Sequence, residues 1–238
     1  SVREPWLWTA WWANVLRFGE ELGDAFGHGL LTSAGLTSES KLLLRRGRVN
    51  TANLSTVGVR AISQLLRVTS ALVHLDLSGN RIGSVGGCEI ICRALMKNAM
   101  IRVLVLNDNV LHREKKAVPA LRKLLVSQAQ LTTLETRDNA LDGLAATTLA
   151  KAVLASETLQ RYNQIPLQEL KGKELLTLEL TMELDIPEAL ILIPLLKTNA
   201  TLQKISARAT AIHGAAAMAL KNVLDTHAQL EQIDVVWV

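Results

Sequence analysis

The stretch LVHLDLSGNRI, residues 72–82, returns in altered form as IRVLVLNDNVL, residues 101–111, and as LTTLETRDNAL, residues 131–141. The three copies share the pattern L-x-x-L-x-L-x-x-N-x-L, with Ile or Thr in place of single leucines. Apolar residues at alternate positions are typical of a β-strand with one buried face. Each copy ends in an asparagine, Asn80, Asn109 or Asn139, where the chain leaves the strand. The repeat therefore predicts one strand in each copy.

The spacing of the copies leaves room for a helix after each strand. The first apolar positions fall at Leu44, Leu72, Ile101, Leu131, Leu159, Leu175, Leu202 and Leu230. Apart from one interval of 16 residues, the intervals run from 27 to 30 residues. Apolar residues at helical spacing predict helices over Gly86–Asn98, Glu114–Ser127, Leu144–Ala155 and Gly214–Thr226.

The motif and its period together resemble leucine-rich-repeat proteins of the ribonuclease-inhibitor-like class. The resemblance covers about residue 42 to the end of the chain. It implies an α/β solenoid, a horseshoe with parallel strands on the concave face and helices on the convex face. It also implies that the three asparagines are buried and bond neighbouring loop backbone, so that replacing one with leucine destabilises the array.

One irregularity interrupts the repeats, near residues 163–175. The segment Pro166–Leu175 leaves no room for a full helix, so we expect a short turn or a single helical turn there. The repeat that begins at Leu175 is weak, because Glu183 and Asp185 occupy positions where Asn and Leu are expected. We therefore expect an array over residues 42–238 with an irregular junction and a locally doubtful strand register.

The exposed strand positions form columns on the predicted concave face, where partners of this family commonly bind. One column places Arg46 beside His74, and another places Thr181 beside Arg208. The face is polar and mixed in charge, with arginine but no aromatic anchor, so it is either a modest protein-binding surface or an ordinary solvated sheet face. The candidate binding residues are Arg46, Arg48, His74, Asp76, Glu135, Arg137, Arg161 and Arg208.

The first 41 residues form a separate head without the repeat pattern. Four of the five tryptophans of the chain fall within residues 6–12, and the apolar spacing from Pro5 onward predicts an aromatic amphipathic helix. This helix caps the first repeat, docks against another protein, or lies on a membrane surface. The candidate partner-binding residues of the head are Trp6, Trp8, Trp11, Trp12 and Phe18.

Nothing in the sequence indicates catalysis, a cofactor or a metal. His74 and Asp76 are neighbours on one strand face, but they lack a nucleophile and an oxyanion site. The two cysteines, Cys88 and Cys92, have no further ligands near them, so we expect a buried apolar pair and a reducing, intracellular site. The net charge of +4 is only mildly basic, so we do not expect the chain to bind nucleic acid.

The predicted function is that of a non-catalytic protein–protein interaction module. The favoured form is an accessory or scaffold subunit of a larger intracellular assembly, with the head as a contact to other proteins or to a membrane surface. The alternative is a soluble regulator or inhibitor that binds one protein through the concave face. The sequence leaves open the compartment, whether mitochondrion, plastid or cytoplasm. It begins at Ser1, so either a leader has been removed or the chain is a fragment.

Overall fold

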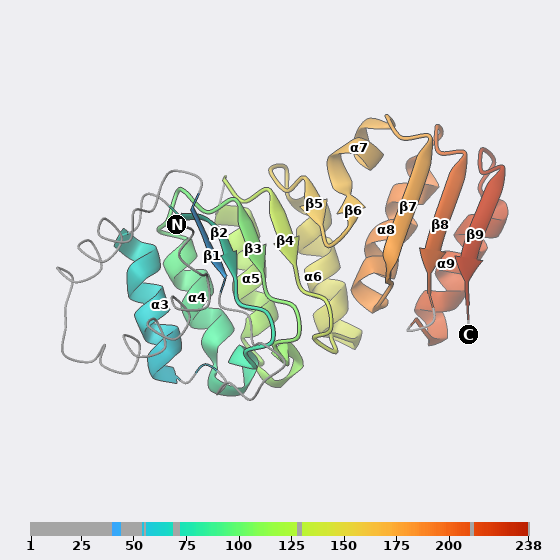
Figure 1. The fold of residues 1–238 in the computed structure, drawn as a ribbon. Helices are drawn as coiled ribbons and strands as arrows, with labels where there is room; N and C mark the ends of the chain where they lie inside the picture. The colour runs from blue at the N-terminus through green and yellow to red at the C-terminus, as the bar shows by residue number, and fades with distance from the viewer. Residues whose placement is uncertain are drawn as a thin grey trace, which may run out of the picture. The chain divides into compact units, whose positions relative to one another are not determined.

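The computed structural model describes residues 40–43, 54, 56–68, 72–127, 130–209 and 212–237. The chain forms two compact α/β units (Figure 1). Unit 1 comprises Ser1–Leu131 with Asp138–Ala140, and unit 2 comprises Thr132–Arg137 with Leu141–Val238. The aromatic helix predicted for the head lies outside the described residues, as do Arg46 and Arg48.

Unit 1 alternates strands with helices, as the repeat spacing predicts. Strands β1, β2 and β3 pair in parallel, and helices α3, α4 and α5 pack side by side. Its described elements are β1 (Ser40–Leu43), α3 (Thr56–Val68), β2 (Leu72–Asp76), the 3-10 helix η1 (Ile82–Val85), α4 (Gly87–Leu95), β3 (Val103–Val105), the 3-10 helix η2 (Leu111–Arg113) and α5 (Ala117–Ser127). The repeat leucines fill the core between strands and helices, where Leu75, Leu77 and Leu104 are fully buried.

Unit 2 contains strands of two sheets. In one, β4 pairs with β5 in parallel and β5 with β6 in antiparallel fashion, whereas β7, β8 and β9 form a parallel sheet. Its described elements are β4 (Thr133–Glu135), α6 (Gly143–Ala155), β5 (Arg161–Tyr162), β6 (Ile165–Pro166), α7 (Leu167–Gly172), β7 (Thr177–Glu183), α8 (Ile186–Thr198), β8 (Lys204–Arg208), α9 (Gly214–Thr226) and β9 (Gln232–Val236). Helix α8 packs against both α6 and α9.

The repeat asparagines are buried and bond loop backbone, as predicted. Asn109 is fully buried, and its Oδ1 accepts from the backbone N–H groups of Asn80 (3.1 Å) and Ile82 (3.3 Å). Its Nδ2 donates to the carbonyl of Leu77 at 2.8 Å. One side chain thus satisfies backbone groups of the preceding repeat, which would cost about 1–3 kcal/mol each if buried without partners.

Asn139 repeats this arrangement one step further along the chain. Its Oδ1 accepts from the N–H groups of Asn109 (2.9 Å) and Leu111 (3.1 Å), and its Nδ2 donates to the carbonyl of Leu106 (2.8 Å). We call Asn80, Asn109 and Asn139 the asparagine ladder. The ladder holds successive strand ends at one spacing, and its members make these bonds to main-chain atoms.

The register of the first strand differs from the prediction. Lys41, rather than Arg46, pairs with His74, and Leu42 pairs with Leu75. Leucine occupies positions 42 to 44 in succession, so the apolar pattern alone allowed more than one strand register. The first repeat is therefore longer than its anchor at Leu44 indicated.

The irregular junction is present and has a simple construction. Strand β5 ends in a tight hairpin, in which Tyr162 pairs with Ile165 and Asn163 adopts a left-handed conformation (φ 52°). The six-residue helix α7 follows, which confirms the short helical turn expected before Leu175. The side chain of Gln164 then accepts from the backbone N–H groups of Thr181 (2.9 Å) and Met182 (3.1 Å) at the edge of β7. A single side chain here occupies hydrogen-bonding positions that a neighbouring strand commonly fills.

Candidate functional site: the polar strand face of β7–β9

The parallel sheet β7–β9 has one apolar and one polar face. On β7 the burial alternates strictly along the strand, with Leu178, Leu180 and Met182 buried. Helices α8 and α9 lie along the apolar face (Figure 1). The opposite face, which we call the polar strand face, comprises Thr177, Glu179, Thr181 and Glu183 of β7, Lys204, Ser206 and Arg208 of β8, and Gln232, Asp234 and Val236 of β9.

Strand register arranges the polar strand face in rows. One row runs Glu179–Ser206–Asp234, so a small hydroxyl lies between two carboxylates. Neighbouring strands are about 4.8 Å apart, which puts the backbones of the two acidic residues roughly 10 Å from each other. Gln232 donates from Nε2 to Asp234 Oδ2 at 2.6 Å and fixes that carboxylate.

A second row differs from the prediction. Arg208 pairs with Glu183, not with Thr181, because the register of β7 against β8 shifts between Glu179 and Glu183. The weak repeat at Leu175 had put the local register in doubt, and the shift occurs in that repeat. It places a basic and an acidic residue opposite each other, with Val236 beside them on β9.

The candidate residues on β2 are less exposed than predicted. His74 is half-buried and pairs with Val103, as the columns predicted. Asp76 was expected on the exposed face but is fully buried. Its Oδ1 accepts from Ser78, both from the backbone N–H (2.9 Å) and from the hydroxyl (2.6 Å), because the chain turns here and the carboxylate caps the turn. Asp76 is therefore a turn residue.

The remaining candidates form local ion pairs in unit 2. Arg137 Nη2 lies 3.4 Å from Glu135 Oε2, and both side chains are half-buried near β4. Arg161 on β5 lies 3.6 Å from Glu169 Oε1 on α7, and both are largely exposed. Glu135 on β4 and Arg161 on β5 belong to a different sheet from Arg208 on β8. The described candidates of unit 2 thus lie in two different sheets and do not form one sheet face.

Sequence reasoning missed a buried polar network in unit 2. The hydroxyl groups of Tyr162 and Thr136 are 2.8 Å apart, and Asn163 Oδ1 accepts from the backbone N–H of Thr136 at 2.9 Å. Asn163 Nδ2 donates to the carboxylate of Glu188, which also accepts from the backbone N–H of Asp185 at 3.2 Å. Burial raises the pKa of Glu188 to about 7. The hydrogen bonds stabilise the ionised carboxylate and act in the opposite direction, toward a lower pKa.

Two signals in the sequence point to this network. Tyr162 is the single tyrosine of the chain, in a region where the repeat fails. The segment Asp185-Ile-Pro-Glu188 before an apolar run has the form of a capping box. The structure shows that box at the start of α8, with Asp185 as N-cap. Burial also raises the pKa of the Tyr162 hydroxyl, and the nearby Glu188 adds to the shift.

The cysteine pair of α4 is buried, as predicted. Cys88 Sγ and Cys92 Sγ are 4.0 Å apart, and both residues are fully buried. The hydrogen bond to Cys92, together with burial, raises the pKa of the Cys88 thiol well above its ordinary value. Glu114 Oε2 and Oε1 accept from the backbone N–H groups of Cys88 (3.0 Å) and Glu89 (2.9 Å). These contacts are structural, since they satisfy the first turn of α4.

No model of a known protein family matches this chain, and no curated protein matches it closely. In the part of the chain that the structure describes, no three His, Cys, Asp or Glu side chains gather as a metal site would require. Among the same residues, no helix is both long and apolar enough to cross a membrane.

Proposed function

We propose that this chain is a leucine-rich-repeat protein of the ribonuclease-inhibitor-like class, acting as a non-catalytic protein-interaction module. One observation carries the proposal: among the described residues, helices lie along one face of the parallel sheet β7–β9, and the residues of the other face are mostly polar and exposed. Parallel sheets are usually covered on both faces. A face that the described residues leave exposed, supported by packed helices, is a broad surface, which suits a folded protein better than a small molecule.

The repeat geometry supports the horseshoe form of the proposal. Strand positions separated by one repeat pair directly, as in Thr177–Lys204–Gln232. The asparagine ladder ties successive repeats of unit 1 through their main chains. Parallel strands held at one spacing, each followed by a helix, are the elements from which such a solenoid is built.

The chemistry of the polar strand face indicates a polar, salt-sensitive contact. Glu179 and Asp234 favour basic groups of a partner, whereas Lys204 and Arg208 favour acidic ones. The face carries no aromatic side chain. We therefore expect specificity to come from charge complementarity, and we expect a second contact to add affinity. The tryptophans of residues 6–12 supply that contact in the favoured form, an accessory or scaffold subunit of a larger intracellular assembly, peripheral to a membrane.

The native size of the protein in a gentle detergent extract tests the proposal. Wild-type protein is expected to elute in an assembly much larger than the 26.0 kDa of the chain. A double charge reversal on the polar strand face, Glu179→Lys with Arg208→Glu, is expected to release it. The matched control reverses two exposed charges on α9, Lys221→Glu with Asp225→Lys, and is expected to leave the assembly intact. Release by both pairs, or by neither, contradicts the role of this face.

The same experiment separates the favoured form from the soluble regulator. A full-length variant with the four tryptophans of residues 6–12 replaced by alanine is expected to leave the assembly if the head is a contact. If that variant behaves like wild type while the strand-face variant loses its partner, the regulator is the correct form.

A further inference from the structure

One position recurs at the end of the repeat helices, three residues before the first apolar residue of the next strand. It is occupied by Asn98, Ser156, Asn199 and His227. In the first three the side-chain oxygen accepts from backbone N–H groups of the loop that follows. The position therefore has a shared structural task, and the residue that departs most from the others is His227.

The two asparagines also reach back to the preceding repeat. Asn98 Nδ2 donates to the carbonyl of Leu66 at 2.7 Å, and Asn199 Nδ2 donates to the carbonyl of Leu170 at 3.1 Å. Each asparagine thus joins its own loop to the preceding helix. The Oδ1 atom of the amide accepts from the loop that follows, and the Nδ2 group donates to the carbonyl of the preceding helix.

His227 performs the first half of this task but not the second. Its Nδ1 accepts from the backbone N–H of Gln229 at 3.3 Å, as the asparagine oxygens do at their positions. In the neutral ring the proton then resides on Nε2, which makes Nε2 a donor. Nε2 is buried and has no hydrogen-bond partner among the described residues. A buried donor without an acceptor is costly, so an acceptor is expected there.

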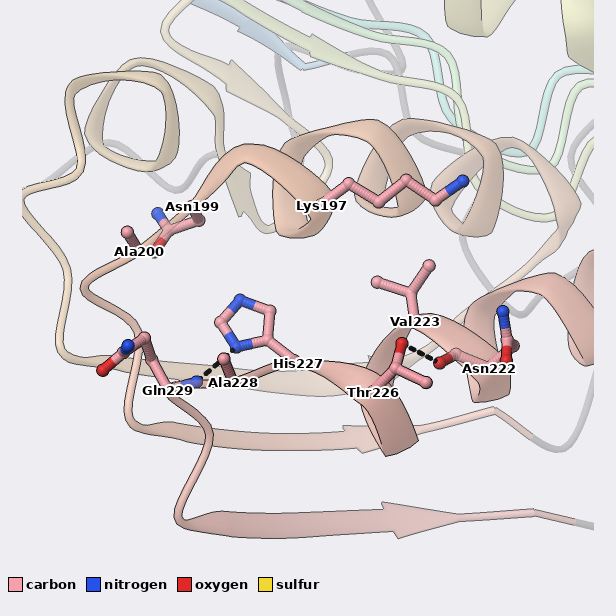
Figure 2. A pocket seen from close by; sticks show the side chains of 9 residues that line it. All are labelled: Lys197, Asn199, Ala200, Asn222, Val223, Thr226, His227, Ala228 and Gln229. Carbon is pink, nitrogen blue, oxygen red and sulfur yellow. Dashed lines mark hydrogen bonds between the residues drawn. The ribbon is translucent and has the colours of Figure 1, made fainter.

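A pocket of about 330 Å³ lies at this position, between the C-terminal ends of α8 and α9. Figure 2 shows the His227 ring standing in it, opposite the end of α8 that carries Lys197 and Asn199. Its other lining residues include the amides Asn222 and Gln229, and none of the lining residues is acidic. The pocket thus combines an unsatisfied buried donor, a cationic side chain and neutral amides.

We propose that this pocket binds a small anion, the phosphate or carboxylate group of a soluble ligand. The Nε2–H of His227 donates to an anionic oxygen. Lys197 lines the pocket and adds positive charge at longer range, since its side chain extends along α8 away from the ring in Figure 2. The pocket is part of the helical side of unit 2, so this ligand does not compete for the polar strand face. The site would make the chain a binder of a small molecule as well as of a protein.

The test uses the full chain, labelled for NMR, with inorganic phosphate and acetate as separate probes. The backbone amide signal of Gln229 is expected to shift saturably with phosphate at concentrations up to about 50 mM, where a millimolar site is filled. A shift with phosphate alone assigns a phosphate-bearing ligand, and a shift with acetate as well assigns either class of anion. The absence of a saturable shift with both probes overturns the proposal.

Two variants make the test specific. His227→Asn installs the residue found at Asn98 and Asn199, so it is expected to keep or raise the melting temperature while abolishing the shift. Lys197→Gln is expected to weaken binding by about 3- to 10-fold, in keeping with an exposed cation. The control Lys221→Gln removes an exposed cation of α9 that does not line the pocket, and it is expected to change nothing. Unchanged binding in His227→Asn, or equal losses in both lysine variants, overturns the proposal.

Discussion

The two units satisfy their buried polar groups by different means. In unit 1 the asparagine ladder places neutral amides against backbone N–H and carbonyl groups. In unit 2 the hairpin after β5 brings Tyr162 and Asn163 into a network that ends on the carboxylate of Glu188. An amide that bonds main-chain atoms carries no charge at any pH. The network contains Glu188, whose pKa burial raises to about 7, so this network of unit 2 titrates near neutral pH whereas the asparagine ladder of unit 1 does not titrate.

The largest effect is expected from breaking the asparagine ladder at its centre. Asn109→Leu removes bonds to Asn80, Ile82 and Leu77 at a fully buried position. The backbone groups left without partners are expected to lower the free energy of unfolding by roughly 3 kcal/mol or more. Urea denaturation followed by circular dichroism measures the loss. Gln64→Leu, on the exposed side of α3, is the control, with an expected change within about 0.5 kcal/mol. A loss of under about 1 kcal/mol for Asn109→Leu would refute the structural role of the ladder.

The next effect concerns pH and belongs to unit 2. The pKa of Glu188 rises from its ordinary value of 4.5 to about 7 in the folded protein. The unfolded chain therefore loses this proton at a lower pH than the folded protein does. Its contribution to stability is complete below about pH 4.5 and is lost as the pH rises through 7, by up to roughly 3 kcal/mol.

Denaturation of wild type and Glu188→Gln between pH 4.5 and 8 checks this prediction. The glutamine does not titrate, so the free energy of unfolding of the variant is expected to fall much less over this range than that of wild type. Burial also raises the pKa of Glu114 in unit 1, and that group remains in both proteins. The difference between the two pH profiles isolates Glu188, and parallel profiles would show that its titration is not coupled to folding.

The smallest expected effect comes from the edge of β7. Gln164→Ala removes the acceptor for the backbone N–H groups of Thr181 and Met182. Water replaces it at an exposed edge, so the free energy of unfolding is expected to fall by only about 1 kcal/mol. Hydrogen exchange at Thr181 is the sensitive measurement and is expected to accelerate. Unchanged exchange there would mean that Gln164 does not protect the strand edge.

The strands and helices of the regular repeats could be predicted from the sequence because apolar residues alternate in each strand and follow helical spacing in each helix. Leucines at alternate positions placed β2, β3 and β8 in the correct register, and helical spacing placed α9 at its observed bounds. The asparagine ladder followed from the resemblance to a known family. The register of β1 was wrong because three successive leucines fit several strand positions equally well.

The candidate site was less predictable because it depends on contacts between residues far apart in the sequence. The alternation that placed Asp76 on an exposed face cannot detect the turn at Ser78 that buries it. The shift between Glu179 and Glu183 arises from an irregular strand pair, which no single strand pattern encodes. His227 occupies the same repeat position as Asn98 and Asn199, but the acceptor role that the three side chains share depends on their contacts in space. A histidine and an asparagine share no sequence signal, although they share one acceptor role.

The asparagine side chains that connect successive repeats contact main-chain atoms, and this has a consequence for divergence. A tie made to a carbonyl or an N–H group is unaffected when the neighbouring side chain changes. Unit 1 can therefore expose a predominantly basic helical side without any change in the bonds of its asparagine ladder. The exposed basic residues of that helical side are Arg60, Arg67, Arg93, Arg122 and Lys123. The side chains exposed on this helical side can thus change without loss of the hydrogen bonds that join successive repeats of unit 1.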